Sequence, residues 1–199
     1  MNIENFQKIS PEKQQSVINA GYLCFAKDGF QKTAMSEIST KAGVSKAALF
    51  HYFGTKENLY EFLFDFACDE ISKNISVGTE DFFECISIGT KIKLEVMAQY
   101  PGMYDFLVTV IKDESEEARK IKRKSNARAI AEGSKTLLAK VDWSKLCSHV
   151  SPLDAMNLVT WVGIGCLQVN AEKSQSEILS EVDRYLAMIK RAVYKEDEK

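Results

Sequence analysis

The sequence is poor in histidine and in paired cysteine, and each shortage excludes a class of protein. Two histidines, His51 and His149, are too few and too far apart to suggest a histidine-based metal or catalytic centre. The five cysteines are odd in number and no two have C-x-x-C spacing, so neither a disulfide framework nor a zinc site is indicated. We therefore expect no metal and no cofactor.

Long apolar runs and a secretory leader are also lacking. The longest stretch without a charged residue, 155–171, is interrupted by polar side chains and is short for a membrane span. The first ten residues have no basic flank followed by an apolar run, so we expect no signal peptide and a cytoplasmic location. No phosphate-loop, dinucleotide-binding, zinc-protease or nucleophile-elbow motif occurs, so we predict that the protein is not an enzyme.

What remains is the composition of an all-helical globular protein. Apolar residues make up 45% of the 199 residues and charged residues 27%, which is enough for a sizeable core. Only three prolines occur and no segment alternates apolar with polar residues for the length of a strand. Residues 1–56 carry seven lysines against four acids, a net +3, so a polyanionic partner is expected there.

Capping residues divide the chain into helices. Ser10, Thr33, Ser45 and Thr55 precede four helical segments, which end near Gly29, Gly43, Gly54 and residue 75. Further helices are expected over 79–100, 103–111, 113–141 and from Pro152, and Ser174 with Glu177 forms a capping box for the last.

Residues 33–53 have the pattern of a helix-turn-helix, in which two short helices meet at Gly43. Leu49 and Phe53 are spaced to pack inward, while Lys46, Ala47, Phe50 and Tyr52 are left partly outward. Such a third helix is suited to the major groove of DNA, because its first residues are small. The same pattern also fits a purely structural helical hairpin.

Several runs here resemble the tetracycline-repressor (TetR) family of transcription regulators. They are Gly29-Phe30, Thr33, residues 38–45, and above all the segment Leu49 to Leu59, LFHYFGTKENL. The resemblance covers roughly residues 11–63. It implies an N-terminal three-helix DNA-binding domain, 1–55, followed by a larger helical ligand-binding and dimerisation domain, 56–199. It also implies a repressor that binds a palindromic double-stranded DNA operator as a homodimer and is released by a small molecule.

By that resemblance, Lys46, Ala47, Ala48 and Phe50 face bases. Lysine can donate to guanine, and the phenyl ring and alanine methyls can touch thymine methyls. The candidate DNA-binding residues are Thr33, Ser36, Ser45, Lys46, Ala47, Ala48, Phe50, His51, Tyr52 and Lys56, with Thr33, Tyr52 and Lys56 expected at phosphates.

Two residues depart from the family pattern. Phe50 stands where tyrosine is usual, and Ser36 stands where a basic residue is frequent. In addition, residues 1–56 contain no arginine. Bidentate guanine contacts by arginine are therefore not available in this region. A helical module that binds a small molecule without reading DNA is the alternative interpretation.

The C-terminal region supplies candidates for an effector site and a dimer surface. Aromatic and methionine side chains could line a cavity for a largely apolar effector, although each could equally belong to the core. These candidates are Phe82, Phe83, Met97, Tyr100, Met103, Tyr104, Phe106, Trp143, Met156 and Trp161. The last two helices are expected to pair with their copies in a homodimer, and no membrane partner is expected.

Overall fold

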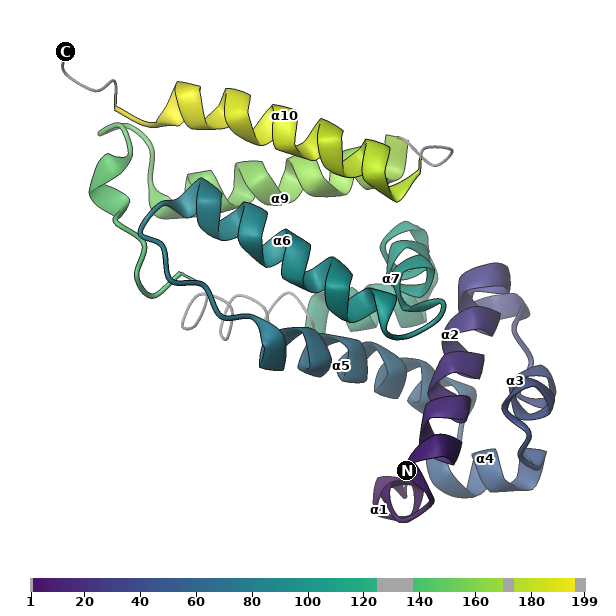
Figure 1. Cartoon of the computed structure of the whole chain (residues 1–199). Coiled ribbons are helices and arrows are strands. Elements are labelled where there is room, and N and C mark those ends of the chain that lie inside the picture. Colours follow the sequence, from purple (N-terminus) through teal and green to yellow (C-terminus); the bar gives the residue numbers. More distant parts are fainter. Residues whose placement is uncertain (1, 125–137, 170–173, 196–199) are drawn as a thin grey trace. The chain divides into compact units, whose positions relative to one another are not determined.

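The computed structural model describes residues 2–124, 138–169 and 174–195, and every regular element in these ranges is a helix (Figure 1). The prediction of an all-helical fold is confirmed. The elements are α1 (Ile3–Gln7), α2 (Pro11–Lys32), α3 (Met35–Ala42), α4 (Lys46–Phe53), α5 (Lys56–Asn74), α6 (Phe82–Ala98), α7 (Met103–Lys112), the 3₁₀ turn η1 (Trp143–Lys145), α9 (Pro152–Val169) and α10 (Gln175–Val193).

Most of the predicted helix starts are confirmed by their caps. The Ser10, Ser45 and Thr55 hydroxyls accept hydrogen bonds from the amides of Lys13, Ala48 and Asn58. Ser174 and Glu177 form the predicted capping box. Residues 116–124 are helical, as expected for the segment 113–141, whose residues 125–137 lie outside the described ranges.

The chain divides into two compact units, one of residues 1–75 and 92–133 and the other of residues 76–91 and 134–199. Helix α6 contributes its first part to the second unit and its last part to the first. The units therefore do not coincide with the chain order, because a C-terminal stretch of α6 and all of α7 join the N-terminal helices.

The first unit is held by α2, which packs against α3, α5 and α7. Its centre is a fully buried aromatic cluster in which Phe106 of α7 lies 5.1 Å from Tyr22 and 5.3 Å from Tyr60, ring centre to ring centre. Helices α2 and α5 approach closely at Gly21, where an added Cβ would lie 2.5 Å from Leu63 Cδ1. A methyl group at this position would therefore require the Leu63 side chain to shift.

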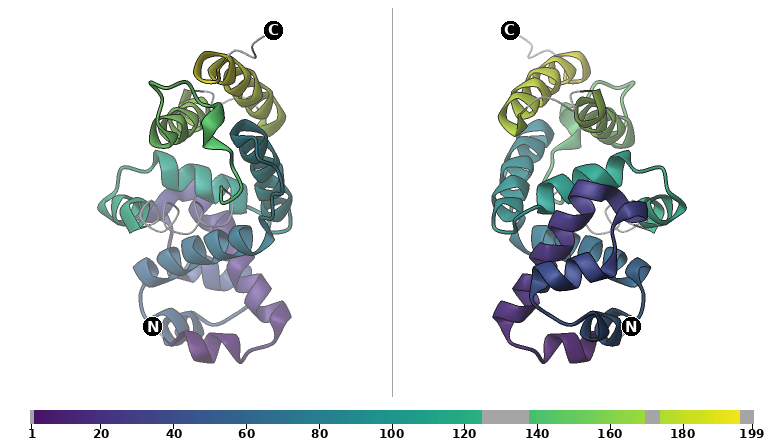
Figure 2. Two further views of the ribbon diagram at one scale, coloured as in Figure 1. Left: turned by 90° about the vertical axis from the view of Figure 1, so that its left-hand side faces the viewer. Right: turned by 90° about the vertical axis from the view of Figure 1, so that its right-hand side faces the viewer.

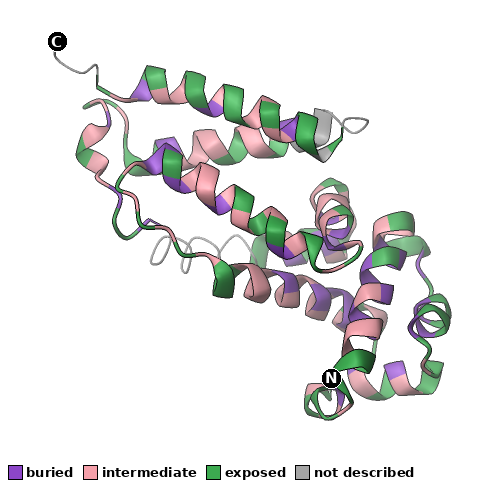
Figure 3. Cartoon of the chain, in the orientation of Figure 1, coloured by how far each residue is buried: buried purple, intermediate pink, exposed green. Residues whose placement is uncertain are grey.

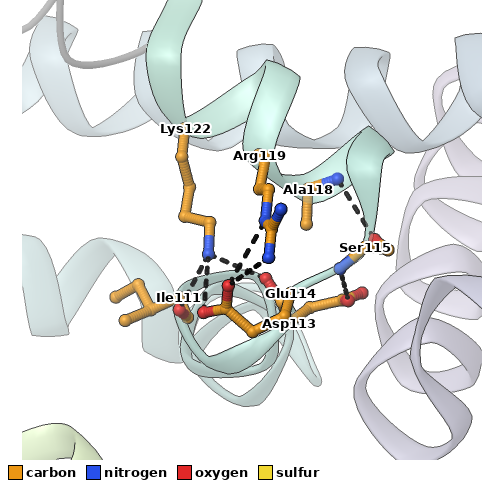
Figure 4. A network of polar contacts seen from close by, with 7 residues as sticks. All are labelled: Ile111, Asp113, Glu114, Ser115, Ala118, Arg119 and Lys122. Carbon is orange, nitrogen blue, oxygen red and sulfur yellow. Dashed lines mark hydrogen bonds and ion pairs between the residues drawn. The ribbon is translucent and has the colours of Figure 1, made fainter.

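The C-terminal end of α7 is fixed by a polar network in the same unit (Figure 4). The Lys122 ammonium donates to the carbonyl oxygens of Ile111 and Asp113, at 3.1 and 2.7 Å. The Asp113 carboxylate in turn accepts from the amide of Ser115. These bonds satisfy carbonyls that a helix end leaves without intrahelical partners.

In the second unit, α9 and α10 lie side by side, as both views in Figure 2 show. Phe82 and Phe83 at the start of α6 are buried with Leu186 of α10 in the core of this unit. The Phe82 amide donates to the Tyr194 hydroxyl at 3.1 Å, and Lys190 Nζ pairs with Asp81 at 2.7 Å. None of the described helices is long and apolar enough to cross a membrane.

Candidate nucleic-acid interface

Helices α3 and α4 form the predicted helix-turn-helix, and the turn between them depends on Gly43. This residue has φ 67° and ψ 30°, the left-handed conformation that glycine adopts without strain. The amides of Gly43 and Val44 donate to the carbonyls of Thr40 and Ser39, which closes the end of α3. The Ser16 hydroxyl of α2 donates to the Ala42 carbonyl at 2.9 Å and ties the turn to the first unit's central helix.

Helix α4 has one buried and one exposed side, as Figure 3 shows. Leu49 and Phe53 are completely buried, which fixes the helix on the unit's core. Lys46, Ala47, Phe50 and His51 are exposed and form what we call the recognition face.

The recognition face carries an apolar ring and a cation together. Phe50 is 41% exposed although it is a large apolar residue. The Lys46 ammonium lies 5.9 Å from the centre of the Phe50 ring, at the spacing of one helical turn. A flat ring that can touch methyl groups, beside a hydrogen-bond donor, is suited to the edges of base pairs.

The beginning of α4 is compact and without acidic side chains. Ser45 accepts from the Ala48 amide at 3.0 Å, and Ala47 and Ala48 add only methyl groups to the first turn. Helix α4 contains no Asp or Glu. The unsatisfied amides of a helix N-terminus favour an anion, so this end is electrostatically suited to approach a phosphate backbone.

Helix α1 supports α4 from the N-terminal side, and the sequence reasoning did not find it. Phe6 is 1% exposed, and its ring centre lies 5.0 Å from that of Phe53 and 5.7 Å from that of Tyr52. The Asn2 amide donates to the Tyr52 carbonyl at 2.7 Å, and Asn5 Nδ2 lies 3.1 Å from His51 Nε2. The i, i+3 spacing of the apolar residues Ile3, Phe6 and Ile9 was the signal available in the sequence.

The structure gives Lys56 a role inside the protein. Its ammonium donates to the carbonyl oxygens of Phe30, Gln31 and Thr33 at 2.7, 3.2 and 3.1 Å, and it lies 4.5 Å from the centre of the Phe30 ring. Because an ammonium has three donors, none is left over for a phosphate in this conformation. Lys56 instead closes the C-terminal end of α2 and holds it to the start of α5.

The prediction that Thr33 caps α3 is wrong, and its side chain is directed into the protein. Thr33 is 2% exposed, and its hydroxyl lies 2.7 Å from the Gly29 carbonyl oxygen and 3.2 Å from that of Cys24. The residue before α3 is Ala34, which provides no side-chain cap. Thr33 stabilises the last turn of α2, where Gly29 has a positive φ of 68°.

The N-terminus of α5 already holds an anion. Hydrogen bonds from its own amide and from the Thr55 hydroxyl hold the pKa of Glu57 below its ordinary value. A phosphate approaching these amides would therefore meet a carboxylate. The other predicted DNA-contacting residues lie at accessible positions, with Ser36 and Ser45 exposed and Tyr52 half-buried against Phe6.

The ten predicted effector-site residues do not form one cluster. Met97, Tyr100, Met103 and Phe106 pack in the core of the first unit, and Phe82, Phe83, Trp143 and Met156 pack in that of the second. Tyr104 is half-buried on α7, and burial raises its pKa. Trp161 is 63% exposed, which corrects its assignment to a cavity wall.

Comparison with known proteins finds a family match in the N-terminal part of the chain. Residues 17–63, which include the whole helix-turn-helix, match the family model of bacterial regulatory proteins, tetR family. This segment is thus similar to the tetR family. Among the chain's described residues, no group of three or more His, Cys, Asp and Glu side chains could hold a metal ion.

Curated HTH-type transcriptional regulators match part of this chain. The HTH-type transcriptional regulator RutR of Escherichia coli K12 is 33% identical over 91 residues, which are 45% of this chain and 43% of RutR. The HTH-type transcriptional repressor AcnR of Corynebacterium glutamicum is 34% identical over 47 residues, 24% of this chain and 25% of AcnR. The chain thus spans less than half the length of these relatives.

Solved tetR structures share the fold over nearly the whole chain. TylP, a tetR regulator from Streptomyces fradiae, has a TM-score of 0.68 with 14% identity and covers 92% of this chain and 87% of its own. SmeT, the repressor of the Stenotrophomonas maltophilia multidrug efflux pump SmeDEF, has a TM-score of 0.66 with 14% identity and covers 96% and 93%. At such identities the likeness concerns the fold alone.

Proposed function

We propose that the protein is a ligand-responsive transcriptional regulator, a repressor that binds a palindromic DNA operator as a homodimer. The observation that carries this proposal is the recognition face of α4. It is exposed, free of acidic residues, and held on a buried anchor of Leu49 and Phe53 within the segment that matches the tetR family. A short, rigid helix fits the major groove when its exposed face carries only neutral and basic side chains.

In this proposal residues 1–55 bind DNA. Lys46 donates to guanine O6 and N7, and Phe50 with the methyl groups of Ala47 and Ala48 contacts thymine methyls. Hydroxyl and imidazole groups contact phosphates beside the groove; these are supplied by Ser36, Ser45, His51 and Tyr52. Since residues 1–56 contain no arginine, sequence-dependent DNA shape contributes to specificity beside the Lys46 contact.

We infer that residues 56–199 hold the effector site and the dimer surface. On α9, Leu153 and Trp161 are 60% and 63% exposed, and Ile164 follows on the same face; we call these three the α9 apolar stripe. Met188 of α10 is 57% exposed. Large apolar residues in a row with no cover within the chain support pairing with a second copy. By contrast, Ile178, Val182 and Ile189 of α10 lie in or against the chain's own core.

The contacts between α7 and α2 support a coupling between effector and DNA. Phe106 and Thr109 of α7 contact α2, the first through Tyr22 and Phe25 and the second by donating to the Ala26 carbonyl at 3.2 Å. Helix α2 also carries the turn before α4 through Ser16. A ligand that shifts α7 therefore changes the free energy of the α4 position that binds DNA. By thermodynamic linkage, DNA binding changes the affinity for the ligand by the same factor as the ligand changes the affinity for DNA.

Selection of bound fragments from random duplexes tests the proposal. We expect a palindromic site whose half-sites are about one or two helical turns apart, with about 34 to 36 Å per turn. Absence of any enriched sequence would overturn the proposal.

The lack of arginine in residues 1–56 and the phenyl ring at position 50 favour one other function, a helical ligand-binding module that does not read DNA. For that module, calorimetry would give the same affinity for its ligand with and without any duplex. The tetR match points to a non-enzymatic regulator, so catalysis is not part of either proposal.

A further inference from the structure

Helix α1 brings a side-chain amide to the recognition face of α4. The Asn5 Nδ2 atom of α1 lies 3.1 Å from Nε2 of His51, which belongs to that face. The two residues are 46 positions apart in the sequence, so their contact exists only because α1 folds back on α4. Asn5 is half-buried and His51 is exposed. The surface offered to DNA therefore receives a contact from outside the helix-turn-helix.

The position of α1 does not depend on this one hydrogen bond. The next residue, Phe6, is 1% exposed, and its ring is packed among three aromatic rings of α4 and α5. On the other side of Asn5, the Asn2 amide donates to the Tyr52 carbonyl oxygen at 2.7 Å. Because α1 is fixed to α4 before and after Asn5, the Asn5 side chain has a defined place beside His51.

The His51 ring is held on a second side by its neighbour. Its centre lies 5.7 Å from that of the Tyr52 ring, and the two planes meet at 66°, an edge-to-face arrangement. In the part of the chain that the structure describes, Asn5 is the hydrogen-bond partner of the imidazole. The ring therefore turns Nε2 toward α1, and Nδ1, which lies on a different side of an imidazole, is directed away from Asn5.

The direction of the Asn5 hydrogen bond determines where the imidazole carries its proton. A side-chain amide nitrogen only donates, so His51 Nε2 accepts through its lone pair and bears no proton. A neutral imidazole has one ring proton, which is then on Nδ1. In a histidine without such contacts the proton resides mainly on Nε2. Asn5 therefore reverses the ordinary preference and makes Nδ1–H the donor that His51 offers to a ligand.

We infer that Asn5 is a positioning residue for DNA binding, which holds His51 as a neutral imidazole whose Nδ1–H donates to a phosphate oxygen of the operator. This inference rests on the proposed DNA-binding function and specifies the chemical form in which His51 acts. A neutral donor fixes the register of the protein on the duplex. Unlike a lysine, it does so without replacing a counter-ion of the phosphate backbone.

The first test locates the ring proton in the full chain without DNA. Nitrogen-15 NMR at about pH 8.5, where imidazole ordinarily carries a single ring proton, shows which nitrogen bears it. The His149→Gln variant assigns the two histidine signals. We expect the His51 proton on Nδ1 in the unchanged chain and in Gln7→Ala, an exposed position of the same helix. Asn5→Ala should return it mainly to Nε2, and so should Asn5→Asp, because a carboxylate only accepts.

The second test measures affinity for the duplex obtained by selection, using fluorescence anisotropy at fixed salt. We expect Asn5→Ala and His51→Phe each to lower the affinity about threefold to tenfold, the value of one neutral hydrogen bond. The double variant should lose no more than His51→Phe alone, because Asn5 acts through the imidazole. Gln7→Ala should bind as the unchanged chain does. The slope of log affinity against log salt concentration should be the same for Asn5→Ala as for the unchanged chain.

Three outcomes would overturn the inference. They are a His51 proton on Nε2 in the unchanged chain, an affinity that Asn5→Ala leaves unchanged, and an effect of Asn5→Ala that persists when His51 is replaced by phenylalanine. The last of these would show that Asn5 supports the fold of α1 only. Absence of any enriched duplex would refute the proposed regulator and with it the phosphate contact. A proton found on Nε2 would instead refute the positioning by Asn5 and leave DNA binding in place.

Discussion

Lys56 shows how one side chain can match a family motif and yet act inside the fold. Its three donors are taken by carbonyls 23 to 26 residues earlier in the chain. Sequence spacing does not reveal such a contact, because it arises only when the end of α2 is brought to the start of α5. The same applies to Thr33, whose hydroxyl lies beside the carbonyls of Gly29 and Cys24 within α2.

Replacing Lys56 by methionine separates its two possible roles. We expect Lys56→Met to lower the free energy of unfolding by roughly 2 kcal/mol, because hydrogen bonds to a charged donor are lost and three carbonyls are left unpaired. Urea denaturation measures this change. Lys32→Met, a substitution of an exposed lysine at the end of α2, serves as the control and changes little.

A phosphate contact by Lys56 would give a different pattern. The stability would then be unchanged, while the slope of log affinity against log salt concentration would fall by about one.

At the scale of elements, local signals predicted most helix boundaries. Caps at Ser10, Ser45, Thr55 and Ser174 are set by side chains within three residues of the bonds they make, so sequence shows them. Helix α1 was missed because the i, i+3 spacing of Ile3, Phe6 and Ile9 is a weak signal in so short a segment. The stability of this five-residue helix comes from the packing of Phe6 on α4 and α5. The spacing of Leu49 and Phe53 correctly predicted which side of α4 is buried and which is exposed.

The packing of α1 predicts that Phe6→Ala is strongly destabilising. Phe6 is buried against Tyr52, Phe53 and Phe62, so its loss should cost roughly 3 to 5 kcal/mol of unfolding free energy. Urea denaturation again provides the value. Gln7→Ala, at an exposed position of the same helix, should cost no more than about 0.5 kcal/mol. Equal effects of the two changes would show that α1 does not support α4.

Asp81 gives the second unit a defined dependence on pH. Burial alone would raise its pKa, but hydrogen bonds from Lys190 and from the Glu84 amide outweigh burial and lower the pKa. A carboxyl whose pKa is lower in the folded state stabilises the fold above its unfolded value of about 3.9. This contribution is lost as pH falls through the folded value.

We therefore expect Asp81→Asn to cost up to about 1 kcal/mol at pH 7, because the ion pair with Lys190 is lost, and progressively less below pH 4. Denaturation curves at several pH values measure the difference from the unchanged chain. Asp183→Asn, at an exposed position of α10, is the control. If the difference in unfolding free energy between Asp81→Asn and the unchanged chain did not shrink in acid, the stabilising ion pair of Asp81 with Lys190 would be contradicted.

At the scale of the whole molecule, the fold class could be predicted from composition and periodicity. The effector-site residues and the dimer surface could not be predicted in this way. The all-helical fold required only that apolar residues recur at helical spacing and that strands be lacking. The effector-site candidates were chosen by residue type, and residue type alone does not separate buried core such as Met103 from an exposed side chain such as Trp161.

The α9 apolar stripe predicts the oligomeric state. Trp161→Glu places a charge in the centre of the stripe and should convert a dimer of two 22.4 kDa chains into monomers without unfolding them. Sedimentation equilibrium measures the mass, and circular dichroism checks the helices. Ser148→Glu introduces the same charge at another exposed position and should leave the dimer intact. A chain that is monomeric before any substitution would refute the proposed dimer.

The central claim is that the recognition face of α4 reads DNA, and competition between the selected duplex and a scrambled duplex at one fixed salt concentration tests it most directly. The account predicts about 10³-fold or greater preference for the selected duplex. It also predicts that Lys46→Ala lowers discrimination at one base pair of each half-site by about 1 to 3 kcal/mol. Equal affinity for the two duplexes, or discrimination unaffected by Lys46→Ala, would contradict it.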